Sequence, residues 1–167
     1  FILGVSGSGK SFFTKREIVS LFLGTNDEII IADPQNEYTA LVTALGGAAI
    51  NLAPTSPTHI NAMDMALGYG DNENPLIAKS EFVLSFIEQI MGGTGKLQAV
   101  DKSIIDRCLT NIYDDYLRSG YTVAPPTLSD LHKELKKQKE KQAKELALAI
   151  EMVAEGNLNM FAHQTNV

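Results

Sequence analysis

In the first fifty positions, some segments have apolar residues at helical spacing, and the segments between them have continuous apolar runs. Residues 11–23 have the spacing of an amphipathic helix, and residues 36–45 repeat it over a shorter stretch. The β-branched run at residues 28–33 and the apolar run at residues 48–52 are typical of buried parallel strands, and residues 1–3 resemble the end of another. Strand, helix, strand, helix, strand is the order of a parallel sheet with right-handed crossovers, so we expect an α/β fold here.

After residue 75 the pattern indicates helices alone. Apolar stripes at helical spacing run through residues 76–91, 98–118 and 143–153. Thr127, followed three residues later by Asp130, resembles a capping box that begins a further helix. Four helices with short connections can bury their stripes against one another, which predicts an all-α subdomain. The predicted organisation is a core part at residues 1–75, a helical insertion subdomain at residues 76–156 and a return segment toward the core at residues 157–167.

One motif carries chemistry, the pattern G-x-x-x-x-G-K-[ST] at residues 4–11. Its glycines allow backbone conformations that are closed to residues with a Cβ, so consecutive N–H groups can turn toward a triphosphate at a helix N-terminus. We expect Lys10 to contact the β and γ phosphates and Ser11 to coordinate Mg²⁺, which makes ATP and Mg²⁺ the predicted cofactors. The predicted nucleotide-binding residues of this Walker A loop are Gly4, Val5, Ser6, Gly7, Ser8, Gly9, Lys10, Ser11 and Phe12.

Composition indicates a folded chain with an uneven charge. The 167 residues, 44% of them hydrophobic, suffice for one core or two small ones, and the absence of a run of about 20 apolar residues favours a soluble protein. Residues 1–132 carry 8 Lys or Arg against 15 Asp or Glu, whereas residues 133–145 carry 6 Lys against 3 Glu. This Lys-rich helix is either a solvated face or a surface that meets DNA or an acidic partner. The single cysteine, Cys108, excludes an internal disulfide.

At Asp33-Pro34-x-x-Glu37-Tyr38, which follows GVSGSGKS, the sequence resembles the HerA/FtsK class of ring ATPases. More narrowly it resembles the conjugal-transfer ATPases of type IV secretion systems, the family of the fourth VirB component and its relatives TraC and TraE. The resemblance continues through LGGAAINLAPTS, INAMD and NLNMFAHQTNV. It implies a RecA-like core with a helical insertion, a hexameric motor ATPase for conjugative DNA transfer or type IV secretion, and other secretion components as partners. It also implies a cytoplasmic location, including the inner face of the bacterial cell membrane.

The resemblance gives further polar residues a role. It places Asp33 and Glu37 at the C-terminal end of the strand beside the phosphate loop. Asp33 could then hold Mg²⁺ through water, and Glu37 could orient the nucleophile, which makes Glu37 and Lys10 the predicted catalytic residues. The alternative, that Asp33 caps the following turn, stays open. Asn61 and Asp64 match a family segment that usually reads Asn-Pro-x-Asp.

A second Mg²⁺-handling strand that ends in Asp-Glu is not found after residue 33. The resemblance places this Walker B strand beyond Val167 and the arginine finger on a neighbouring subunit. Because the sequence also begins at Phe1 without Met, we expect a piece of a longer protein. Two other functions stay open: a small-molecule or nucleotide kinase in which the helical segment forms a lid, and a non-enzymatic helical interaction module.

The isolated chain is expected to bind Mg-ATP and to hydrolyse it negligibly, because the second Mg²⁺-handling strand is missing from the sequence. Phosphate release by the 167-residue chain, followed under excess Mg-ATP, checks this expectation. Rapid turnover would mean that Asp33 and Glu37 suffice for hydrolysis.

Overall fold

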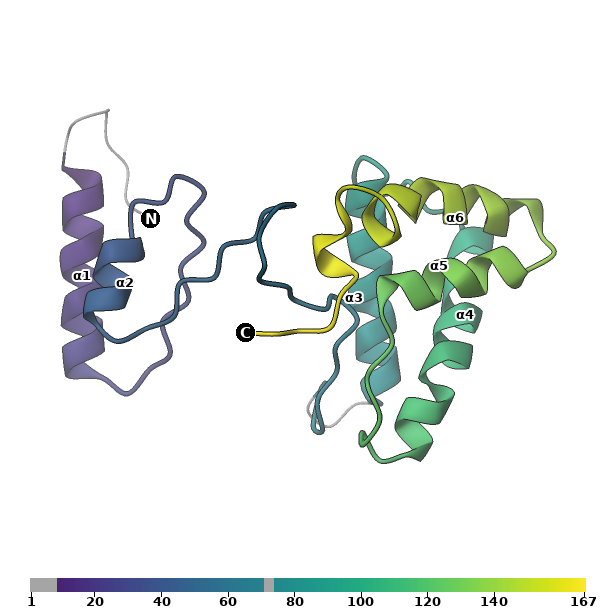
Figure 1. The fold of residues 1–167 in the computed structure, drawn as a ribbon, viewed down its shortest axis with the longest axis horizontal. Helices are drawn as coiled ribbons and strands as arrows, with labels where there is room; N and C mark the ends of the chain where they lie inside the picture. Colours follow the sequence, from purple (N-terminus) through teal and green to yellow (C-terminus); the bar gives the residue numbers. More distant parts are fainter. Residues whose placement is uncertain (1–8, 71–73) are drawn as a thin grey trace. The chain divides into compact units, whose positions relative to one another are not determined.

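The computed structural model describes residues 9–70 and 74–167, and the chain divides into two compact units (Figure 1). Unit 1 is Phe1–Ile50 and unit 2 is Asn51–Val167. The sequence placed a boundary at residue 75, whereas the units divide at residue 50. The difference has a local cause, because residues 59–65 contact the helices of unit 2 and its C-terminal segment.

Unit 1 contains two helices in its described part. They are α1 (Lys10–Gly24) and α2 (Thr39–Ala44), which confirms the helices predicted at residues 11–23 and 36–45. The Lys15 ammonium lies 5.3 Å from the centroid of the Tyr38 ring, and Tyr38 is the N-cap of α2. This cation–π contact therefore connects α1 to the start of α2.

The predicted parallel sheet is wrong, because residues 9–70 and 74–167 contain no strand. Residues 28–33 have no regular secondary structure, no backbone hydrogen bond joins them to residues 48–52, and Ile30 is 91% exposed. A β-branched run becomes a strand only when a neighbouring run pairs with its N–H and C=O groups. The α/β class and its RecA-like sheet core are thus replaced by a helical architecture.

The apolar stripe of α1 is not buried, although its spacing is that of an amphipathic helix that packs on another element. None of the residues of α1 is buried, and Phe12 is 75% exposed. A helical stripe predicts where a helix can pack, but burial requires another element to cover it. Residues 28–33, the next segment along the chain, form no sheet that could cover it.

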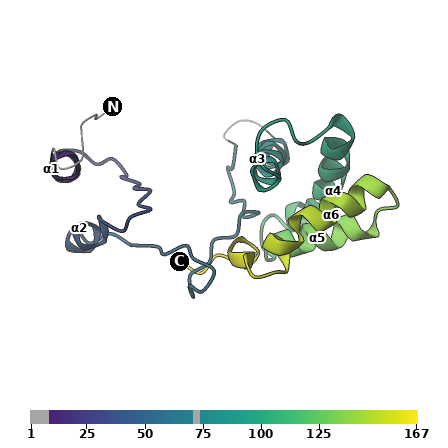
Figure 2. The ribbon, with the colours of Figure 1, turned by 90° about the horizontal axis from the view of Figure 1, so that it is seen from above.

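Unit 2 is a bundle of the four predicted helices (Figures 1 and 2). They are α3 (Pro75–Ile90), α4 (Ala99–Arg118), α5 (Leu128–Lys137) and α6 (Lys141–Ala154), followed by the short 3₁₀ helix η1 (Asn159–Phe161). Asn74 caps α3 by accepting a hydrogen bond from the Leu76 N–H at 3.0 Å. The capping box predicted for α5 is confirmed, since the Asp130 carboxylate accepts from the Thr127 N–H at 2.9 Å.

The core of unit 2 is built from the stripes that the sequence indicated. Each of the four helices contributes several buried apolar side chains. They include Val83 and Ile87 of α3, Ile104, Ile105, Cys108 and Leu109 of α4, Leu131 and Leu135 of α5, and Leu146, Ala147 and Ile150 of α6. Burial removes this apolar surface from water, which contributes about 25 cal/mol per Å² to stability.

A buried turn at residues 61–65, here called the 61–65 turn, is held by side chains from two helices. The Tyr113 hydroxyl of α4 donates to the Met63 carbonyl, and the Tyr116 hydroxyl donates to the Met65 carbonyl at 2.6 Å. The Lys79 ammonium of α3 donates to the Ala62 carbonyl at 3.5 Å. Buried carbonyls require such donors because water does not reach them.

Asn61 connects this turn to two distant parts of unit 2. Its amide nitrogen donates to the Pro126 carbonyl at 2.9 Å and to the Gln164 side chain at 3.2 Å. Its amide oxygen accepts from the Met63 N–H at 2.9 Å. One buried side chain thus holds the turn, the segment before α5 and the C-terminal segment together.

The C-terminal segment lies beside the segment that precedes the 61–65 turn. The His59 N–H donates to the Asn166 side chain at 2.7 Å, and the Asn166 N–H donates to the His59 carbonyl at 3.2 Å. The Thr165 hydroxyl accepts from the Asn61 N–H at 3.0 Å. Residues 57–61 and 164–166 therefore form one hydrogen-bonded closure of unit 2.

Replacing Asn61 by Ala is expected to destabilise unit 2 by about 1–3 kcal/mol for each buried group left without a partner, here the Pro126 carbonyl and the Met63 N–H. Chemical denaturation followed by circular dichroism measures this change. Asn157→Ala is the matched control because the Asn157 side chain is exposed. Equal stabilities of the two variants would contradict the role assigned to Asn61.

Candidate functional site

The predicted phosphate loop is described in part. Gly4, Val5, Ser6, Gly7 and Ser8 lie outside the described residues. Gly9, Lys10, Ser11 and Phe12 are described, and they form the N-cap and the first three positions of α1.

Gly9 has a backbone conformation that favours glycine. Its φ of 82° and ψ of 14° are left-handed, and a Cβ at this position would meet no atom within 4 Å. Its carbonyl accepts from the Phe13 N–H at 2.9 Å, which is the first hydrogen bond of the helix. The N–H groups of Ser11 and Phe12 precede this bond and have no acceptor within the helix.

The first turn of α1 has the electrostatic character of an anion site. The helix has 15 residues, no acidic side chain lies in its first turn, and its N-terminal end carries the positive end of the helix dipole. Lys10 is half-buried at the first helical position, and Ser11 is exposed beside it. The residues present therefore fit a phosphate group.

These residues also fit Mg²⁺ that is bound together with phosphate. In the described part of the chain, no group of three or more His, Cys, Asp or Glu side chains is arranged to hold a metal ion. Mg²⁺ typically keeps several waters and takes one or two protein ligands together with substrate phosphates. The Ser11 hydroxyl is suited to such a ligand set, and the role stays a prediction.

Asp33 caps the turn that follows it. Its carboxylate accepts from the Tyr38 N–H at 2.8 Å, and its carbonyl accepts from the Asn36 N–H at 3.3 Å. Desolvation raises the pKa of the Asp33 carboxyl, but hydrogen bonds from backbone N–H groups, first that of Tyr38, outweigh it and leave the pKa below the ordinary value. The carboxylate thus has a structural partner, and its role toward Mg²⁺ stays a prediction.

The described contacts do not join Asp33 or Glu37 to the first turn of α1. Among residues 9–70, no hydrogen bond links Ser11 to Asp33, and Glu37 is exposed on the turn before α2. The catalytic role of Glu37 therefore stays a prediction.

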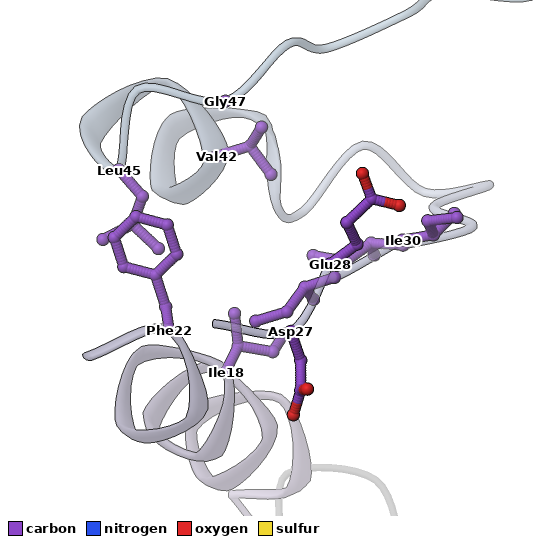
Figure 3. A pocket seen from close by; sticks show the side chains of 10 residues that line it. Ile18, Phe22, Asp27, Glu28, Ile30, Val42, Leu45 and Gly47 are labelled. Carbon is purple, nitrogen blue, oxygen red and sulfur yellow. The ribbon is translucent and has the colours of Figure 1, made fainter. Parts of the chain in front are cut away.

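Unit 1 also has an apolar pocket of about 410 Å³ between its two helices (Figure 3). Phe22 of α1 reaches toward Leu45, and Val42 of α2 points into the same space (Figure 3). Ile18, the pocket residue nearest to the start of α1, comes eight residues after Lys10, about 12 Å along the helix. The pocket is therefore distinct from the predicted phosphate site.

Lys79 is a buried charged residue that the sequence analysis missed. It is 3% exposed, and its ammonium lies 4.4 Å from the Tyr69 ring centroid and 4.8 Å from that of Phe82. Desolvation lowers the pKa of Lys79, and the nearby Asp64 carboxylate partly opposes this shift. The sequence contains one signal for the burial of Lys79. Lys79 lies four residues before Val83 and therefore on the same face of the helix, which faces the core.

None of the described helices is both long enough and apolar enough to span a membrane. This finding concerns residues 9–70 and 74–167 alone.

Family comparison defines the class of this chain. The family model "Helicase HerA, central domain" matches residues 1–165, so the chain belongs to this family. Among solved structures, that of VirB4 of Thermoanaerobacter pseudethanolicus aligns over 98% of this chain with a TM-score of 0.75 and 23% identity, which shows a shared fold. The resemblance to the HerA class is thus confirmed, and that to the fourth VirB component is confirmed at the level of the fold. This chain spans 45% of that VirB4 chain, and no curated protein matches it.

Replacing Asp33 by Ala is expected to change the environment of the Tyr38 amide, because the carboxylate that accepts from it is removed. In the unsubstituted chain, this hydrogen bond should be complete above the ordinary Asp pKa and should weaken as the pH falls through the lowered pKa of the folded state. The Tyr38 amide shift in an NMR titration measures both effects. Asp27→Ala is the control, and a Tyr38 amide that is insensitive to Asp33→Ala and to pH would contradict the assignment.

Proposed function

We propose that this chain is the nucleotide-binding part of an ATPase motor of type IV secretion. One observation carries the proposal: Gly9 is a left-handed N-cap directly before Lys10 and Ser11, at the start of a 15-residue helix. Membership of the HerA family and the fold shared with VirB4 support the class of motor.

The chain's own residues would bind the phosphates of ATP at the start of α1. The Ser11 and Phe12 N–H groups and the helix dipole would hold the phosphate oxygens, and Lys10 would add a positive charge. Bound Mg²⁺ would neutralise part of the phosphate charge. Ser11 would supply its hydroxyl as a ligand, Asp33 would hold a water of the ion, and Glu37 would orient the attacking water.

We extend the proposal from this nucleotide site to the function of the whole protein. We place it in a hexamer that hydrolyses ATP, acts with other type IV secretion components and drives conjugative DNA transfer. Its location would be the cytoplasm, at the inner face of the bacterial cell membrane. These statements rest on the likeness to VirB4, of which this chain spans 45%, and on membership of the HerA family.

Lys10→Ala is expected to weaken Mg-ATP binding by about tenfold or more, because it removes the positive charge nearest to the predicted phosphates. Isothermal titration calorimetry with Mg-ATP measures the affinity. Arg16→Ala is the matched control, since it removes an exposed positive charge from the same helix. Unchanged affinity in Lys10→Ala would overturn the assignment of the phosphate site.

A second pair of variants tests the backbone geometry of the same site. Gly9→Ala introduces a side chain at a left-handed position, which costs about 1–2 kcal/mol and should weaken binding about fivefold to thirtyfold. Gly24→Ala is the control, because Gly24 has no left-handed φ and an added Cβ there would meet nothing within 4 Å. Similar affinities of the two variants would contradict a role for the Gly9 conformation.

A further inference from the structure

A groove on unit 2 lies between α5 and α6, which run side by side in both ribbon views (Figures 1 and 2). Its volume is about 290 Å³. Nothing in the proposed nucleotide site uses it. The lining residues are His132 and Lys136 of α5 and Lys144, Ala147, Leu148 and Glu151 of α6.

Two of the lining residues, Ala147 and Leu148, are apolar. Ala147 and His132 are buried, and the His132 imidazole lies 3.8 Å from the Glu155 carboxylate. Leu148 is 71% exposed, and Met152, one turn further along α6, is exposed as well. Neighbouring exposed apolar side chains beside a depression are typical of a contact surface.

The lining of the groove carries more positive than negative charge, because it contains two lysines, Lys136 and Lys144, and one carboxylate, Glu151. Three lysines of the Lys-rich region have carboxylate partners: Lys133 with Asp130, Lys137 with Glu134 and Lys141 with Glu145. The other three are Lys136, Lys139 and Lys144, and among residues 74–167 no carboxylate lies within 4.0 Å of their ammonium groups. Two of these three, Lys136 and Lys144, line the groove.

We propose that this groove binds an acidic amphipathic helix of a partner protein. Apolar side chains of that helix would cover Ala147 and Leu148, and its carboxylates would meet Lys136 and Lys144 from opposite walls. An amphipathic helix presents apolar and charged side chains within one turn of each other, which matches the spacing of Lys144 and Leu148 on α6.

One feature favours a protein over a nucleic acid in this groove. The exposed Leu148 and Met152 side chains add nothing to phosphate binding, whereas they can be covered by apolar side chains of a helix.

The test uses the 167-residue chain and a designed probe. The probe is a fluorescein-labelled helical peptide with leucines on one face and glutamates on the other, and its twin has lysines in place of the glutamates. Fluorescence anisotropy should show binding of the acidic peptide, and Lys136→Glu with Lys144→Glu should weaken it by about tenfold or more. Leu148→Ser should weaken it too.

The matched control is Lys133→Glu with Lys139→Glu, which makes the same change of charge outside the groove. This variant should keep the affinity, as should Lys10→Ala, so the test is independent of nucleotide binding. Thermal unfolding followed by circular dichroism verifies that each variant is folded.

Four outcomes would overturn the proposal. They are no binding of the acidic peptide, equal binding of the lysine twin, equal losses in the two double variants, and displacement of the peptide by a random-sequence DNA duplex that binds through the same lysines. Equal losses would indicate a general electrostatic surface. Displacement by DNA would identify a nucleic-acid surface instead.

Discussion

The arrangement of unit 2 depends on satisfying the buried carbonyls of the 61–65 turn. This non-helical segment lies in the interior, where water does not supply donors. The helices supply them: Tyr113 and Tyr116 from α4, and Lys79 from α3. Apolar stripes alone allow helices to rotate or slide against one another, whereas hydroxyl and ammonium groups that must reach particular carbonyls select one arrangement. The hydrogen bonds to the 61–65 turn thus fix the positions of α3 and α4 within unit 2.

Local patterns predicted the helices well and the sheet badly, for a physical reason. A helix satisfies its backbone within its own residues, so the spacing of apolar residues and a pair such as Thr127 and Asp130 suffice to locate it. A strand depends on another segment for its hydrogen bonds. The run at residues 28–33 has the composition of a strand, yet no partner pairs with it in the described part of the chain.

The residues of the functional site and of the buried turn show the same difference. Features that depend on neighbouring residues could be predicted, whereas contacts between residues far apart in the sequence could not. The spacing of Gly9, Lys10 and Ser11 predicted a helix start suited to phosphate, and the left-handed Gly9 agrees with that use of glycine. The contacts of Lys79 could not be predicted, because a lysine counts as polar in any hydropathy pattern. The carbonyl that accepts from Tyr113 lies fifty positions earlier in the sequence, so no short motif contains both groups.

The closure formed by His59 and Asn166 has a mechanical consequence. A tension applied between the segment before the 61–65 turn and the C-terminal segment would load these hydrogen bonds before it reached any of the four helices. In a protein that experiences force, such a closure would protect the helical fold from being pulled apart.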